Sequence, residues 1–206
     1  MKILEIIGLP LDGVKILKFE RFRDERGYFS SVLRLGDLAK APFLSGFRVS
    51  ESADSRSRAG TVRGLHFQWN PNQGKLVRTV SGHMVDILLD LRRKSPTLGR
   101  VILYSMPADD QRDWDEWIWI PPGFAHGNFY AQDSLITYLI DGQYNPACEA
   151  GISPWAPDLD WSLAETGLKN EFDGLSRRGC IASEKDLNGL SLSAWLMDKR
   201  AESCGF

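Results

Sequence analysis

Cysteine, histidine and long apolar runs are all scarce in this chain of 206 residues. Its three cysteines, Cys148, Cys180 and Cys204, are odd in number and widely spaced, and no signal peptide is recognisable. These features disfavour a disulfide-linked secreted fold. No apolar run approaches the roughly 20 residues that span a bilayer. We therefore expect a reduced, soluble protein of the cytoplasm.

The chain also lacks a strong net charge. Its 25 basic and 27 acidic residues leave a formal net charge of −2. It therefore has no overall basic field that would draw it to nucleic acid or to a membrane surface, and we expect neither partner. An anionic small molecule would have to be held by local arginines and lysines. The length and the 43% hydrophobic content predict one domain over residues 1–206.

Short β-strand patterns dominate as far as about residue 145. They are separated by Gly, Pro, Asn and Asp residues typical of turns, with no long helical period between them. The segments concerned are 14–19, 76–80, 83–91, 100–104, 116–120 and 134–140. This pattern predicts an all-β fold, an antiparallel sandwich or barrel. Residues 184–188 and 193–197 suggest short helices or loops, so we expect about 164–206 to form a C-terminal extension packed on the barrel.

Two of the three histidines lie in strand segments bounded by Gly and Pro. His66 follows Arg63-Gly64-Leu65, and His126 follows Pro122-Gly123-Phe124-Ala125. Paired segments of this kind are typical of a cupin jelly roll, whose interior holds a ligand or a metal. A metal-binding cupin needs two closely spaced histidines and a carboxylate in its first segment, and only one histidine is present here. We therefore predict neither a metal nor another cofactor.

A set of motifs in fixed order resembles the dTDP-4-dehydrorhamnose 3,5-epimerase family. They run from about residue 20 to 161, and a further short match is Ser-Glu-Lys-Asp over 183–186. The matching segments are 26–29, 63–68, 75–77, Gly82 with Asp86, 90–92 with 95–99, 120–127, and Tyr138 with 144–146. The resemblance implies a homodimeric, metal-free cupin jelly roll. It also implies epimerisation of nucleotide-diphosphate 4-keto-6-deoxy sugars at the carbons that flank the ketone.

The chemistry of such a reaction explains the residue types. A C–H next to a ketone becomes acidic only if the enolate oxygen is stabilised, and inversion needs a proton delivered to the opposite face. The resemblance implies that His66 is the base, Lys75 the enolate stabiliser and Tyr138 the acid. It also implies a group of substrate-binding residues, with guanidinium groups suited to the diphosphate. These are Arg26, Phe29, Glu51, Arg63, Gln68, His126 and Tyr144.

The chain departs from the family pattern behind the base. An aspartate expected to orient the histidine falls on Ala156 in the segment 151–159. We therefore expect a broken His–Asp pair and a weakened base, unless another carboxylate substitutes. Asp158, Asp160 and Asp86 are the candidates for this role.

A second departure lies in the segment expected to contact the nucleotide. It reads Glu51-Ser52-Ala53-Asp54-Ser55 in place of Gln-x-Asn-x-Ser, and Ser31 replaces a glutamate. A carboxylate accepts hydrogen bonds, and cytosine presents an amino donor where thymine presents an acceptor. Our hypothesis is that a CDP-sugar replaces the dTDP-sugar.

Three functions follow from these patterns. The first is an epimerase that inverts C3, C5 or both, with C3 alone favoured because an altered site would have to accept two ring poses for double inversion. The second is a cupin-type nucleotide-sugar ketoisomerase, which moves the ketone by the same enolisation. The third is a nucleotide-sugar binding protein without catalytic activity.

Overall fold

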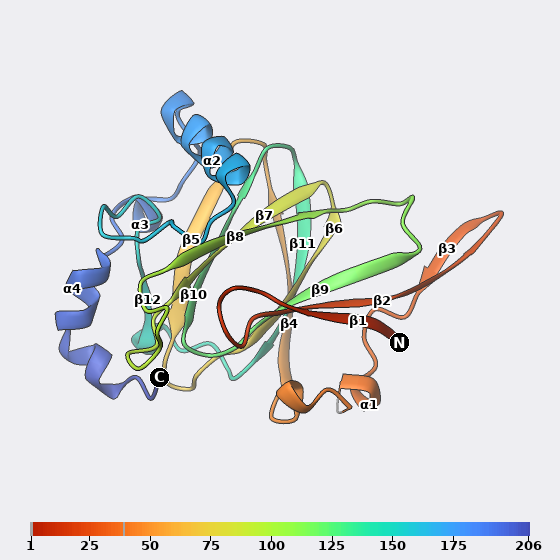
Figure 1. Cartoon of the computed structure of the whole chain (residues 1–206), viewed down its shortest axis with the longest axis horizontal. Helices are drawn as coiled ribbons and strands as arrows, with labels where there is room; N and C mark the ends of the chain where they lie inside the picture. Colours follow the sequence, from red (N-terminus) through yellow and green to blue (C-terminus); the bar gives the residue numbers. More distant parts are fainter. Residues whose placement is uncertain (1, 39) are drawn as a thin grey trace.

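Two antiparallel β-sheets face each other in the computed structural model, which describes residues 2–38 and 40–206 (Figure 1). The larger sheet has the order β1 (Ile3–Gly8), β2 (Lys15–Asp24), β9 (Trp114–Ile120), β6 (Lys75–Ser81), β11 (Ser134–Asp141) and β4 (Val49–Ser57), and β3 (Gly27–Ser30) pairs with β2. The smaller sheet has the order β12 (Glu149–Gly151), β5 (Val62–Gln68), β10 (Phe124–Tyr130), β7 (His83–Asp90) and β8 (Val101–Pro107). The predicted all-β, cupin-type fold is confirmed.

A hydrophobic core fills one end of the space between the sheets. Ile16, Val77 and Ile118 of the larger sheet meet Leu88 and Phe124 of the smaller sheet there. Because side chains alternate across a strand, each of these strands sends every second residue into this core. The other end of the space is left for the candidate site.

The outer face of the smaller sheet is covered by the C-terminal helices α2 (Thr166–Arg178) and α4 (Leu192–Met197), with η3 (Lys199–Ser203) and α3 (Glu184–Leu187) beside them (Figure 1). The ring of Trp195, which is buried, packs 4.7 Å from that of Phe67 and 5.3 Å from that of Trp69. Since both faces of the smaller sheet are covered, β7 is buried along almost its whole length. This explains why the sequence of β7 is a nearly continuous apolar run.

Short turns of helix lie beside the opposite face of the larger sheet. They are α1 (Leu35–Leu38) and η1 (Pro42–Leu44), and Leu38 and Leu44 pack with Trp117 and Trp119 of β9. A further turn, η2 (Pro146–Cys148), precedes β12. Among the described residues, no helix is long and apolar enough to cross a membrane.

The hairpin of β2 and β3 projects from the body of the molecule (Figure 1). Phe22 is 55% exposed and Phe29 is 68% exposed on this hairpin, although both are large apolar side chains. A cluster of exposed aromatic residues on an arm of this kind is typical of a contact surface.

Candidate active site

A cavity of about 840 Å³ lies between the two sheets and opens to solvent. One wall is β4, whose alternate residues Glu51, Ala53, Ser55 and Ser57 line it. This explains why β4 is polar where the other strands are apolar. The structure brings eight of the ten predicted site residues to this cavity: His66, Lys75, Tyr138, Glu51, Arg63, Gln68, His126 and Tyr144.

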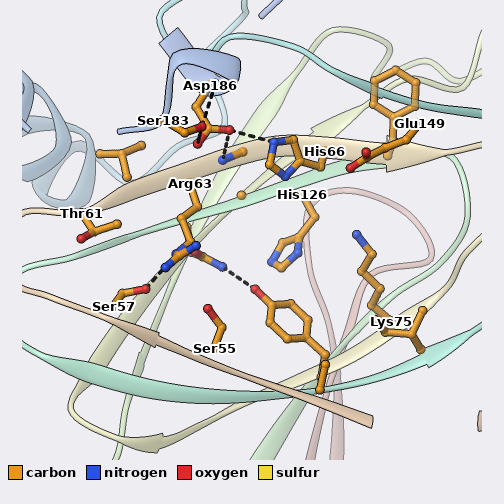
Figure 2. Close-up of a pocket in the computed structure, with 18 of the residues that line it drawn as sticks. Ser55, Ser57, Thr61, Arg63, His66, Lys75, His126, Glu149, Ser183 and Asp186 are labelled. Carbon is orange, nitrogen blue, oxygen red and sulfur yellow. Dashed lines mark hydrogen bonds and ion pairs between the residues drawn. The ribbon is translucent and has the colours of Figure 1, made fainter. Parts of the chain in front are cut away.

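The carboxylate behind His66 belongs to Asp186, from the C-terminal region. Nε2 of His66 lies 2.7 Å from Oδ1 of Asp186, and Figure 2 shows the other ring nitrogen turned toward the cavity. The expectation of a broken His–Asp pair is therefore wrong. Ala156 is buried in the core beneath the C-terminal helices, and its lack of a carboxylate has no consequence for His66.

Asp186 is held in place by its own short helix. Ser183 caps the start of α3, and its hydroxyl donates to Asp186 Oδ2 over 2.7 Å, while the backbone N–H of Gly64 donates to Oδ1 over 3.3 Å. Burial alone would raise the pKa of Asp186, but its contacts with His66, Ser183 and Gly64 outweigh burial and lower it to about 2. The carboxylate is therefore ionised at neutral pH, and its position beside Nε2 favours the imidazole tautomer that carries its proton there.

The other aspartates that the sequence suggested have different partners. Asp158 accepts hydrogen bonds from the backbone N–H groups of Leu192 and Ser193 at the start of α4. Asp160 forms an ion pair with Arg100 over 3.5 Å. Neither contacts His66.

Asp86 pairs with the second histidine of the site. Nε2 of His126 lies 2.8 Å from Oδ1 of Asp86, and both side chains are almost fully buried. His126 is the cross-strand partner of His66, so the two imidazoles project from neighbouring positions of β10 and β5. Burial lowers the pKa of His126, with the Asp86 carboxylate opposing this effect, and favours the neutral imidazole.

Lys75 reaches the cavity from the larger sheet, opposite the two histidines (Figure 2). Burial lowers the pKa of its ammonium from 10.5 to about 8, against the smaller opposing effects of Glu149 and Asp86. Among residues 2–38 and 40–206, Lys75 has no ion pair. Its ammonium is therefore charged at neutral pH and available to a ligand oxygen.

Tyr138 lies next to His126, with ring centroids 5.9 Å apart in an edge-on arrangement. Its hydroxyl accepts a hydrogen bond from Nδ2 of Asn128 over 3.2 Å. Burial raises the pKa of Tyr138 to about 12, although the bond from Asn128 acts in the opposite direction. The phenol is therefore protonated at neutral pH, as an acid must be before it donates.

The rim of the cavity carries the remaining predicted residues. Nε of Arg63 donates to Ser57 Oγ over 2.9 Å, and the Tyr144 hydroxyl donates to Glu149 over 3.0 Å. The buried amide of Gln68 donates to two backbone carbonyls, over 2.8 and 3.0 Å, and accepts from the backbone N–H of Asn145. Gln68 therefore positions the loop that presents Tyr144.

Arg26 and Phe29 are the two predicted substrate contacts that the structure does not bring to the cavity. They lie on the β2–β3 hairpin, and their side chains are 84% and 68% exposed. No group of three or more His, Cys, Asp or Glu residues suited to a metal ion occurs in the described part of the chain.

The chain is similar to proteins of known activity along most of its length. The model that describes the dTDP-4-dehydrorhamnose 3,5-epimerase family matches residues 8–194. The chain belongs to this family. A dTDP-4-dehydrorhamnose 3,5-epimerase of Methanothermobacter thermautotrophicus is 35% identical over 189 residues, which cover 88% of this chain and 91% of the relative.

Two solved structures show how closely the fold is shared. The dTDP-6-deoxy-D-glucose-3,5-epimerase of Legionella pneumophila, in complex with dTDP-4-keto-L-rhamnose, is 30% identical with a TM-score of 0.77, covering 97% of this chain and 96% of that one. A 3'-monoepimerase of Streptomyces bikiniensis, in complex with dTDP-quinovose, is 25% identical with a TM-score of 0.71, covering 91% and 87%. Double and single epimerases therefore share this fold.

Proposed function

We propose that the chain epimerises a nucleotide-diphosphate 4-keto-6-deoxyhexose, with inversion at C3 favoured over inversion at both C3 and C5. The observation that carries the proposal is the arrangement around the cavity. His66 of the smaller sheet is paired with Asp186 of α3, and Lys75 and Tyr138 reach the same space from the larger sheet. A base and an acid on opposite walls are what inversion at carbon needs.

The proposed steps use each group once. Nδ1 of His66 removes the proton from a carbon next to the ketone. The electron pair of that C–H bond forms a C=C bond to the carbonyl carbon, and the π pair of the C=O bond moves onto the ketone oxygen. The Lys75 ammonium stabilises the enolate oxygen. When the enolate collapses, the Tyr138 hydroxyl gives its proton to the opposite face of the same carbon. His66 then releases a proton to solvent and Tyr138 regains one, so the protons balance.

Exchange with deuterated water tests this proposal. We expect incubation with the 4-keto-6-deoxyglucose nucleotide in D₂O to place deuterium on the inverted carbon while the ketone stays at C4. His66→Ala should abolish the exchange, whereas His83→Ala should leave it intact because His83 bonds to Ser105 and does not line the cavity. Migration of the carbonyl would favour the ketoisomerase, and no exchange in the wild type would favour a binding protein.

The nucleotide is proposed to be CDP, supported by Glu51 in the wall of the cavity. Its carboxylate is a hydrogen-bond acceptor, which suits the exocyclic amine of cytosine and not the carbonyl at the same position of thymine. Ala53, two residues along the same wall, adds no competing amide. We expect a higher kcat/KM with the CDP-sugar than with the dTDP-sugar, and Glu51→Gln should reduce the difference. A clear preference of the wild type for dTDP would refute the assignment.

The homodimer is proposed because Arg26 and Phe29 lie too far out on their hairpin to serve their own cavity. A second copy would bring both residues to the diphosphate and the base. Mixed dimers test this arrangement. His66→Ala and Arg26→Ala are each expected to be nearly inactive alone. Subunits of the two variants unfolded and refolded together should regain activity, since some sites then receive both native residues. No recovery in verified mixed dimers would contradict shared sites.

A further inference from the structure

The strand that carries His126 also carries a buried amide that the steps above do not use. Asn128 follows His126 by two residues on β10, so both side chains lie on the same face of the strand, and both line the cavity. Asn128 is 1% exposed. A buried amide at this depth needs partners for its polar atoms, because leaving one unpaired costs about 1–3 kcal/mol.

One half of the amide holds the proposed acid. Nδ2 of Asn128 donates to the Tyr138 hydroxyl oxygen over 3.2 Å. Because this bond occupies a lone pair of the phenol oxygen, the O–H of Tyr138 must point elsewhere, and the cavity lies next to it. The same N–H would stabilise the phenolate that remains after Tyr138 gives up its proton.

The other half of the amide lacks a partner in the described part of the chain. Oδ1 of Asn128 is buried, and no donor among residues 2–38 and 40–206 forms a hydrogen bond with it. Since the residue lines the cavity, a ligand hydroxyl that displaces the atoms now covering Oδ1 can supply the missing donor. The acceptor therefore lies beside the group that would reprotonate the sugar.

The two carbons that flank the ketone differ in what they could offer Oδ1. C3 carries a hydroxyl group, which is a donor, whereas C5 carries a methyl group and the ring oxygen, which are not. A sugar bound with C5 next to Tyr138 would leave Oδ1 buried and unpaired. A sugar bound with C3 there would satisfy it.

We propose that Asn128 is a positioning and specificity residue, whose N–H orients the Tyr138 hydroxyl and whose carbonyl binds the C3 hydroxyl of the sugar, so that the site inverts C3. The inference rests on the proposed epimerase function and adds the choice of carbon. The chemical class that Asn128 selects is a 4-keto sugar with a free 3-hydroxyl group.

Three variants test the inference, with deuterium incorporation at C3 and C5 and inversion at each carbon followed by NMR in D₂O. Asn128→Leu keeps the size of the side chain and removes both polar atoms. We expect the rate of inversion at C3 to fall at least about tenfold. Asn170→Leu is the matched control, since Asn170 is exposed on α2 outside the cavity, and should match the wild type.

Asn128→Asp separates a positioning role from a merely structural one. A carboxylate only accepts, so it would draw the Tyr138 proton to itself and leave no acid for the sugar. His66 would still remove the C3 proton and return a deuteron to the same face. We therefore expect deuterium to enter C3 without inversion. If Asn128→Leu does not fold, Asn128→Ser keeps a small polar side chain at this position and should lower the rate at C3 in the same direction.

The outcomes separate a failure of this inference from a failure of the proposed epimerase function. Normal inversion of C3 by Asn128→Leu, normal inversion by Asn128→Asp, or labelling of C5 alone in the wild type would each overturn the role of Asn128. No labelling at either carbon in the wild type would overturn the epimerase function itself.

Discussion

Replacing Asp186 with asparagine would remove the charge behind His66 and keep the size of the side chain. In the native chain, the carboxylate lies 2.7 Å from Nε2 of His66, which favours the tautomer with the proton on Nε2 and leaves on Nδ1 the lone pair that accepts the substrate proton. An asparagine amide can turn its own N–H toward Nε2. It would then stabilise the opposite tautomer, in which Nδ1 is protonated and cannot act as the base.

Two contributions set the size of the effect. The pKa of Asp186 falls from 3.8 to about 2 through contacts that outweigh its burial, which corresponds to about 2–3 kcal/mol shared among all its partners. These partners include Ser183 and Gly64 as well as His66, so only part of this energy concerns the base. The wrong tautomer is the larger contribution, and with it we expect kcat to fall by about 100-fold to 10,000-fold.

Steady-state kinetics and deuterium exchange both measure this loss. Asp186→Asn should lower kcat and the exchange rate together, with a much smaller change in KM. Asp158→Asn is the matched control, because that carboxylate caps α4 away from the cavity, and its kcat should stay within about twofold of the wild type. A folded Asp186→Asn variant with less than a tenfold loss would refute the assignment of Asp186 as the group that orients His66.

Two further expectations follow from the same cavity. Burial lowers the pKa of Lys75 to about 8, so its ammonium is deprotonated as the pH rises through that value and kcat should decline above about pH 8. A pH profile of kcat that stays flat to about pH 10, near the pKa of an ordinary lysine, would contradict the role of Lys75. Gly64 has a φ of +102°, and an added Cβ would lie 2.5 Å from the Cα of Gly127. Gly64→Ala should therefore destabilise the fold by about 2–3 kcal/mol and lower the Tm, and an unchanged Tm would show that β5 and β10 can separate at low cost.

The sequence predicted most of the strands but missed β4, which forms one wall of the cavity. The six segments with apolar patterns correspond to β2, β6, β7, β8, β9 and β11. β4 was not predicted because its alternate residues face the cavity and are polar, which removes the usual apolar signal. The longest helix, α2, was not predicted either. Leu168, Phe172 and Leu175 have helical spacing, but Gly167 and Gly174 lower the helix propensity of the segment.

The candidate site shows a different limit of sequence reasoning. His66, Lys75 and Tyr138 could be placed together because each lies in a recognisable motif. Asp186 lies in the Ser-Glu-Lys-Asp segment, which carries a visible signal: a serine N-cap followed three residues later by a carboxylate. What the sequence could not supply was the contact between this turn and β5, since it is made by residues far apart in the chain: Ile181 pairs with the backbone at the start of β5, and Gly64 donates to Asp186.

The two histidines of the cavity look equivalent in sequence, and burial separates their roles. Each has an aspartate at Nε2, at 2.7 Å for His66 and 2.8 Å for His126. The side chain of His66 is 30% exposed at the cavity, whereas that of His126 is 3% exposed, and burial lowers the pKa of His126. A base that takes a proton from the substrate must be reached by it, and His66 meets this condition. His126, which resists protonation, is suited instead to hydrogen bonding as a neutral imidazole, and His126→Ala should therefore lose less activity than His66→Ala.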